Sequence, residues 1–203
     1  MIAWINFAVM LVLTVLFLLF YVRSARPAGR EMISGPGAYQ LCFYERMVSA
    51  IFEFTIVANY ILYFYYPLQT PLPVKFPWSW WISLLVALLI GIPATTLMII
   101  GVRDAGEEAM RPRKEHSMYG GIYTRIRHPQ ATGEVFLFLV IALLLNSPFL
   151  AVFSLIYFPL FIVLCYVEEQ DLLLRYGEAY AEYCRKTGSF WPKRFMSIHG
   201  RKV

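Results

Sequence analysis

Cysteine and charged residues are scarce in this chain of 203 residues, and each shortage excludes a class of protein. The cysteines, Cys42, Cys165 and Cys184, lie far apart and form no C-x-x-C pair, so neither a disulfide framework nor a metal site is expected. Charged residues make up 15% of the chain and hydrophobic residues 59%, which is too apolar for a soluble domain. The net charge of +5 does not indicate nucleic-acid binding, because the basic residues flank apolar runs.

Long apolar runs predict an all-α, polytopic membrane protein with about five transmembrane helices. The runs cover residues 1–22, 47–66, 78–102, 131–145 and 149–167. The last two form a helical hairpin, because only a short uncharged turn separates them. The fourth run spans only ~22 Å, less than a hydrocarbon core of ~30 Å. Either its Arg127–His128 end is recessed into the membrane, or the hairpin tip stops short of the far face.

The segments between the runs predict the topology. Residues 23–38 form a polar, turn-rich loop, and residues 67–77 form a proline-rich connector whose only charge is Lys75. Residues 103–127 are the longest polar stretch and can carry a short helix. An amino terminus on the outside places nearly every Lys and Arg inside and leaves Lys75 alone outside. This arrangement satisfies the positive-inside rule.

Residues 168–186 alternate aromatic and charged side chains at helical spacing. The pattern predicts an amphipathic tail helix that lies against the membrane face or the bundle, and a simple interfacial anchor would show the same pattern. The acid pair Glu168-Glu169 fits an anchor poorly, because a cationic flank is expected where an apolar helix leaves the membrane.

Chemistry is most strongly indicated in the stretch from Gly120 to Pro129. Pro129 suits the first turn of a helix, so we expect a helix that begins at His128 or Pro129 and continues through Leu145. The free N–H groups of that turn, with Arg127 and His128 beside them, would form an anion site at the membrane boundary. The alternative is a cytoplasmic flank that only orients a transmembrane helix.

Together these motifs resemble the carboxy-terminal module of the isoprenylcysteine carboxyl methyltransferase and phospholipid methyltransferase superfamily. The motifs are Gly121-Ile122-Tyr123, Arg127-His128-Pro129 with Gly133, Glu168-Glu169, Tyr176-Gly177 with Tyr180, and Phe190-Trp191-Pro192. The resemblance implies an integral membrane enzyme that binds S-adenosylmethionine on the cytoplasmic side and methylates a lipophilic acceptor from the bilayer. It divides the chain into the amino-terminal helices, 1–102, and a cofactor-binding catalytic module, 103–203.

The resemblance also implies where the cofactor would be contacted. These positions are Glu115, His116, Ser117, Met118, Tyr123, His128, Pro129, Gln130, Ala131 and Glu168. The helix start at His128 suits the carboxylate of the cofactor, and Glu168 suits its cationic sulfonium and ammonium groups. Tyr123 and Trp191 could cover the adenine. Arg127, beside His128, is a candidate catalytic residue.

Two positions depart from the family pattern and bear on the acceptor. Ala131 replaces a tyrosine, and Leu164 replaces the arginine of relatives that methylate a prenylcysteine carboxylate. A buried carboxylate without a cation is costly, so we expect an amine, a thiol or a lipid headgroup instead. Such an amine or thiol needs a base, and the membrane-depth acids Glu53 and Glu134 are candidates. A structural hydrogen bond, or an ion pair with Arg46, is the alternative role for these acids.

Two other classes of function stay open on the sequence. Sterol reductases resemble the same carboxy-terminal architecture and bind a nicotinamide cofactor, although this chain is short for their helix count. A non-enzymatic membrane scaffold or small transporter would use the charged clusters only as topology signals. It would bind neither cofactor.

Overall fold

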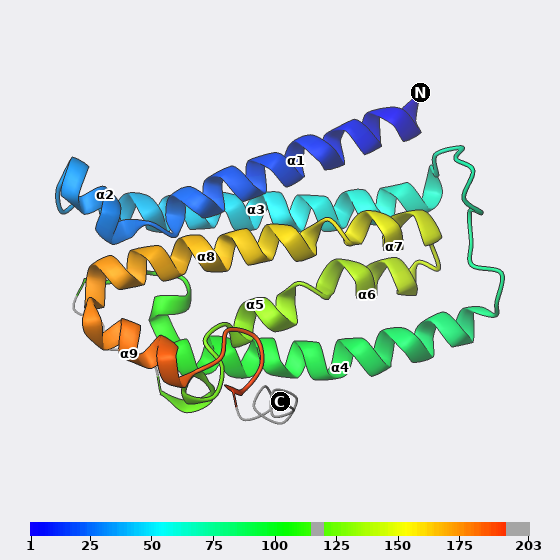
Figure 1. Cartoon of the computed structure of the whole chain (residues 1–203). Coiled ribbons are helices and arrows are strands. Elements are labelled where there is room, and N and C mark those ends of the chain that lie inside the picture. Colours follow the sequence, from blue (N-terminus) through cyan, green and yellow to red (C-terminus); the bar gives the residue numbers. More distant parts are fainter. Residues whose placement is uncertain (115–119, 194–203) are drawn as a thin grey trace, which may run out of the picture.

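The computed structural model describes residues 1–114 and 120–193, and this part of the chain is helical and contains no β-strand. The longest helices, α1 (Ile2–Ser24), α3 (Ala38–Tyr65), α4 (Trp80–Ala105) and α8 (Tyr157–Tyr176), run along the same axis (Figure 1). The segments long and apolar enough to cross a membrane are Ile2–Ser24, Ala38–Tyr65, Trp80–Ala109 and Pro148–Tyr176. The chain is therefore an all-α, multi-pass membrane protein, as its apolar runs predict.

The predicted hairpin is present, but each of its helices is interrupted. The first is divided into α5 (Pro129–Glu134) and α6 (Leu137–Leu144), and the second into α7 (Pro148–Ser154) and α8. The predicted helix from His128 or Pro129 through Leu145 is therefore present as Pro129–Leu144, with a break at residues 135–136. Pro159 accounts for the second break, because it has no N–H to donate to the carbonyl of Leu155 one turn earlier.

The hairpin tip, between α6 and α7, lies beside the first turn of α4, at the end of the bundle opposite α2 and α9 (Figure 1). Trp80 Nε1 donates to the carbonyl of Leu144 at 2.9 Å, and Ser83 Oγ donates to Asn146 Oδ1 at 2.7 Å. The tip thus reaches the level where α4 begins. Since the hairpin is shorter than its neighbours, it is the His128 end that is recessed into the bundle.

Glycines allow α5 to pack directly against the backbone of α4. A Cβ atom on Gly133 would lie 2.2 Å from the carbonyl oxygen of Ala94, and one on Gly101 would lie 2.8 Å from the amide nitrogen of Gln130. Only residues without a side chain permit this approach. The contact holds the start of α5, from His128 to Gln130, against the last turns of α4.

One of the polar segments contains a helix that the sequence does not predict, because the predicted loop 23–38 contains α2 (Pro27–Ser34). The longest polar stretch, which was expected to be able to carry a short helix, contains the short 3₁₀ helices η1 (Gly106–Ala109) and η2 (Gly121–Thr124). The predicted tail helix is divided, because α8 continues to Tyr176 and α9 (Glu178–Lys186) begins only after Gly177. Gly177 has φ +57°, which turns the chain at this point.

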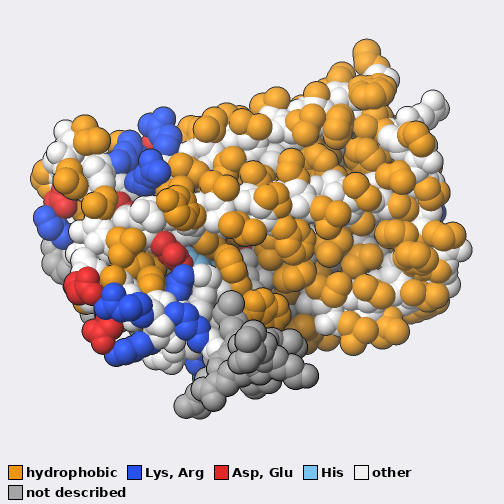
Figure 2. Space-filling model, viewed as in Figure 1, with side chains coloured by type: hydrophobic (Ala, Val, Ile, Leu, Met, Phe, Trp, Pro, Cys, Tyr) orange, Lys and Arg blue, Asp and Glu red, His pale blue; other side chains and the backbone are white. Residues whose placement is uncertain are grey.

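The two ends of the bundle differ in surface chemistry. Aromatic side chains fill its centre, where Phe138 stacks on Tyr157 with ring centroids 3.8 Å apart. Hydrophobic side chains cover most of the outer face, whereas Lys, Arg, Asp and Glu gather at the end that contains α2 and α9 (Figures 1 and 2). The recessed His128 end of the hairpin opens toward this charged end.

Candidate active site

The two open ends of the hairpin meet in a cluster of ion pairs. Arg127 Nε and His128 Nε2 each lie 2.8 Å from Glu169 Oε1, and His128 Nδ1 lies 3.6 Å from Glu168 Oε2. The basic motif that begins α5 and the acid pair of α8 are therefore direct neighbours. Their convergence is the arrangement that the predicted hairpin requires.

Arg127 connects this cluster to the carboxy-terminal segment. Its Nη1 donates to the carbonyls of Cys184 and Thr187 at 3.2 and 2.6 Å, and its Nη2 donates to Ser189 Oγ at 2.5 Å. Its backbone N–H donates to the carbonyl of Gly188 at 2.8 Å. Arg127 therefore holds α9 and the following turn against the start of α5.

His128 is buried between the two acids. Burial lowers the pKa of His128, but hydrogen bonds with Cys165, Glu168 and Glu169 raise it more, so its pKa lies well above the ordinary histidine value. The imidazole therefore carries its proton at neutral pH, and both of its nitrogens face carboxylates. Neither Arg127 nor His128 is left as an unpaired cation for a bound anion.

Tyr123 is held in place by a tight turn at the end of α4. The carboxylate of Asp104 accepts the backbone N–H of Ile122 at 2.8 Å, and a Cβ on Gly121, which has φ +58°, would collide with it. Tyr183 of α9 donates to the carbonyl of Tyr123 at 2.7 Å. These contacts fix Tyr123, which is 6% exposed, beside the ion-pair cluster.

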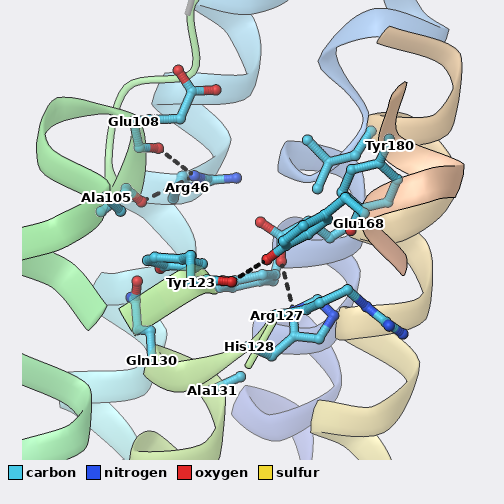
Figure 3. Close-up of a pocket in the computed structure, with 14 residues that line it drawn as sticks. Arg46, Ala105, Glu108, Tyr123, Arg127, His128, Gln130, Ala131, Glu168 and Tyr180 are labelled. Carbon is cyan, nitrogen blue, oxygen red and sulfur yellow. Dashed lines mark hydrogen bonds and ion pairs between the residues drawn. The ribbon is translucent and has the colours of Figure 1, made fainter. Parts of the chain in front are cut away.

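A pocket, called here the polar pocket, lies next to this cluster (Figure 3). Its walls are Tyr21, Arg46, Ala105, Glu108, Ala109, Tyr123, Arg127, His128, Gln130, Ala131, Glu168, Leu172, Tyr180 and Tyr183. It holds about 50 Å³ of free space, so it admits a large ligand only by widening or by extending into a neighbouring space. Ala131, the position of the family tyrosine, is part of the wall.

Of the six predicted cofactor contacts that the structure describes, five line this pocket. Tyr123, His128, Gln130, Ala131 and Glu168 line it, and Pro129 is fully buried behind them. The predicted contacts Glu115, His116, Ser117 and Met118 lie outside the described residues. Trp191 does not line the pocket and is 70% exposed, so the structure does not support its expected role over the adenine.

A second space, called here the apolar pocket, adjoins the first and has a volume of about 380 Å³. Its walls are Tyr21, Arg46, Ser49, Ala50, Glu53, Phe54, Val57, Met98, Val102, Ala109, Met110, Gln130, Glu134 and Leu137. Phe54 and Met110 on its wall are 76% and 45% exposed, so the pocket opens on the apolar outer surface. The two pockets share Tyr21, Arg46, Ala109 and Gln130.

Glu53 and Glu134, the candidate bases, both line the apolar pocket. Within residues 1–114 and 120–193, no carboxylate forms an ion pair with Arg46 at 4.0 Å or less, so the ion pair considered from the sequence is not formed. Both carboxyl groups therefore border the apolar pocket without an ion pair to Arg46.

The sequence does not predict that residues of the amino-terminal helices and of α9 line the polar pocket. Tyr21 and Arg46 come from α1 and α3, and Tyr180 and Tyr183 come from α9. Arg46 stands beside Glu45 at the start of an apolar run, which is the pattern of a topology signal. Leu164, where some relatives have an arginine, is only 2% exposed and packs in the hydrophobic core.

Fold and site together define a multi-pass helical membrane protein with an ion-paired pocket at its charged end. Residues 84–179, from the first turns of α4 to the start of α9, match the family model described as phospholipid methyltransferase. This match confirms the predicted resemblance to the isoprenylcysteine and phospholipid methyltransferase superfamily. The family implies methyltransferase activity on a membrane lipid. Comparisons with curated proteins and with solved structures give no match.

Proposed function

We propose that this protein transfers a methyl group from S-adenosylmethionine to a lipophilic acceptor that enters from the bilayer. The observation that carries the proposal is the pair of joined pockets with opposite character. A charged cofactor fits the polar pocket, and an apolar acceptor fits the pocket that opens on the hydrophobic surface. The shared wall brings the two reactants together.

The donor set of the polar pocket suits the cofactor. When bound, S-adenosylmethionine supplies an electrophilic methyl group on a cationic sulfur. The side chain of Glu168 is 36% exposed beside the pocket, and it can face the sulfonium and ammonium groups. The rings of Tyr123, Tyr180 and Tyr183 provide apolar surface for the adenine. Methyl transfer depends mainly on alignment and on the exclusion of water, which these walls provide.

The apolar pocket suits an acceptor that must lose a proton. The new bond forms between the methyl carbon and an amine or thiol, and the bonding electrons stay on the sulfur that leaves. We propose that one of the two acids that line this pocket, Glu53 or Glu134, takes the proton of the acceptor. Leu164 packs in the hydrophobic core, so this position offers no cation to the carboxylate of a prenylcysteine.

Arg127 and the two predicted parts of the chain also have proposed roles. Arg127 is engaged with Glu169 and with backbone carbonyls, so we assign it to positioning and not to contact with the reactants. Residues 103–203 supply most of the cofactor walls, and residues 1–102 supply one acid of the pair. We place the amino terminus outside and the polar pocket at the cytoplasmic face, because the charged end then lies inside.

A thermal-shift comparison of purified protein in detergent tests the proposal. We expect S-adenosylmethionine and S-adenosylhomocysteine to raise the melting temperature and NADPH to leave it unchanged. The Glu168→Gln variant should lose the shift, whereas Glu182→Gln, an exposed acid on α9, should keep it. A shift with NADPH alone would favour a reductase. No shift with any of the three compounds would favour a scaffold or transporter and defeat the proposal.

A further inference from the structure

Arg46 differs from the other cations of the polar pocket because it has no carboxylate partner in the part of the chain that the structure describes. Arg127 and His128 both contact Glu169 at 2.8 Å, whereas no acid oxygen lies within 4.0 Å of the guanidinium of Arg46. A cation that borders an apolar, membrane-embedded pocket is unfavourable without a counter-charge. The pocket wall therefore presents a positive charge that is not neutralised by direct contact.

The hydrogen bonds of Arg46 leave part of its guanidinium unused. Nη1 donates to the carbonyls of Glu108 and Ala109 at 3.3 and 3.0 Å, which aims the group from α3 toward η1. Nε is buried and has no acceptor within residues 1–114 and 120–193. The guanidinium lies 5.8 Å from the ring of Tyr21, which restricts it further. An oxyanion in the pocket would satisfy both the free N–H and the charge.

Glu168 supplies a negative charge on the side of the polar pocket opposite Arg46. Figure 3 shows Arg46 and Glu168 on opposite sides of the polar pocket, one from α3 and the other from α8. A cation facing an anion across a narrow space is complementary to a zwitterion. We propose that Arg46 binds the carboxylate of the amino-acid part of S-adenosylmethionine, while Glu168 faces its ammonium and sulfonium groups. This inference rests on the proposed cofactor.

The structure favours Arg46 over the helix start at His128 for this carboxylate. His128 is already paired with Glu168 and Glu169, and α5 has only six residues, so its dipole is small. Arg46 belongs to α3, outside residues 84–179 that match the family model. The amino-terminal helices would thus supply a binding group from outside the matched region.

Binding measurements with two ligands test the assignment. S-adenosylhomocysteine carries the carboxylate, and S-adenosyl-3-thiopropylamine lacks only that group. We expect Arg46→Gln to weaken S-adenosylhomocysteine roughly 10- to 100-fold and the amine analogue less than about twofold, measured by calorimetric titration in detergent. Arg23→Gln removes the same charge from an exposed residue that pairs with Glu45, and it should change neither affinity.

Equal weakening of both ligands would mean that Arg46 only supports the pocket through η1, and unchanged affinity for both would mean that it binds neither. Either result overturns the inference. The inference is also overturned if Arg46→Gln raises only the KM for the lipid acceptor. If Arg46→Gln does not fold, Arg46→Lys should still weaken S-adenosylhomocysteine selectively, because lysine keeps the charge but loses the fork of N–H groups. A wild-type protein that binds neither ligand would instead defeat the proposed function.

Discussion

The polar and apolar pockets share a wall but hold their acids in opposite ways. At the polar pocket, the wall residue Glu168 and its neighbour Glu169 lie within 3.6 Å of His128, and Arg127 adds a second cation. In the apolar pocket, Glu53 and Glu134 line the wall, and no cation forms an ion pair with either acid among the described residues. Acids fixed by ion pairs stabilise the fold, whereas acids without a cationic partner remain available to take a proton. We therefore propose that one pocket serves binding and stability and the other serves proton transfer.

The largest effect is expected from the acid pair. Glu134→Gln and Glu53→Gln should each lower the rate of methyl transfer by roughly 10²- to 10⁴-fold, because the acceptor then loses its base. The rate is measured as transfer of label from S-adenosylmethionine into the lipid fraction of membranes that contain the protein. The affinity for S-adenosylhomocysteine should stay within about twofold, since the acids lie outside the polar pocket.

Two results would contradict the assignment of binding to the polar pocket and of proton transfer to the apolar pocket. An active Glu53→Gln, Glu134→Gln double variant would show that the pair is only a structural hydrogen bond. A parallel loss of cofactor affinity would show that the two pockets act as one site. Glu107→Gln, at an exposed acid near the same end of the bundle, is the matched control and should behave as wild type.

The neighbouring acids Glu168 and Glu169 allow a comparison within the polar pocket. Glu169→Gln should destabilise the protein by about 3–5 kcal/mol, because it removes the negative charge that Arg127 and His128 share, and the side chains of these two residues are only 11% and 4% exposed. Glu168→Gln should cost stability much less, because its carboxylate is more exposed and lies farther from His128. Melting temperatures in detergent measure this difference.

The two substitutions should affect cofactor affinity in the opposite order to their effects on stability. Glu168→Gln should weaken S-adenosylhomocysteine by roughly 10-fold or more, whereas folded Glu169→Gln protein should retain most of its affinity. Calorimetric titration provides the measurement. Equal losses of affinity in the two variants would mean that the acids form one binding unit and that their different contacts have no functional meaning.

The sequence predicted those features that depend on local pattern or on chain reversal. Charge-free runs predict the spans, and the short uncharged turn at Asn146 predicts that His128 and Glu168 return to the same end. It did not predict the role of Arg46, because a basic residue at a helix mouth looks the same whether or not it faces a pocket. Only the packing of α3 beside η1 places Arg46 in both pockets.

The break between α8 and α9 shows a second limit. Aromatic and charged residues continue the helical period through Gly177, and periodicity alone therefore predicts one helix. The positive φ of Gly177 instead turns α9 back, so that Tyr180 and Tyr183 reach the polar pocket. Glycine at a helix end was the available signal, and it was outweighed by the regular pattern around it.

The smallest effect is expected in the part of the pH dependence of stability that comes from His128. The pKa of His128 is raised in the folded protein, although burial lowers it, because Cys165, Glu168 and Glu169 accept hydrogen bonds from the ring or lie beside it. Its stabilisation is therefore complete below the unfolded pKa of about 6.5. It is lost as the pH rises through the folded pKa, by at most about 1.4 kcal/mol per pH unit.

Melting curves of wild type and His128→Gln between pH 6 and pH 9, an interval of about three units around the ordinary histidine pKa, measure this loss. The wild type should lose more stability than the variant as the pH rises, because only the wild type releases this proton. Arg127 is present in both proteins and stays charged over the range, so its ion pair with Glu169 cancels in the difference. Parallel curves would mean that His128 is already neutral in the folded protein. The acids of the polar pocket would then be held by Arg127 alone, and the contrast between the two pockets would rest on a single cation.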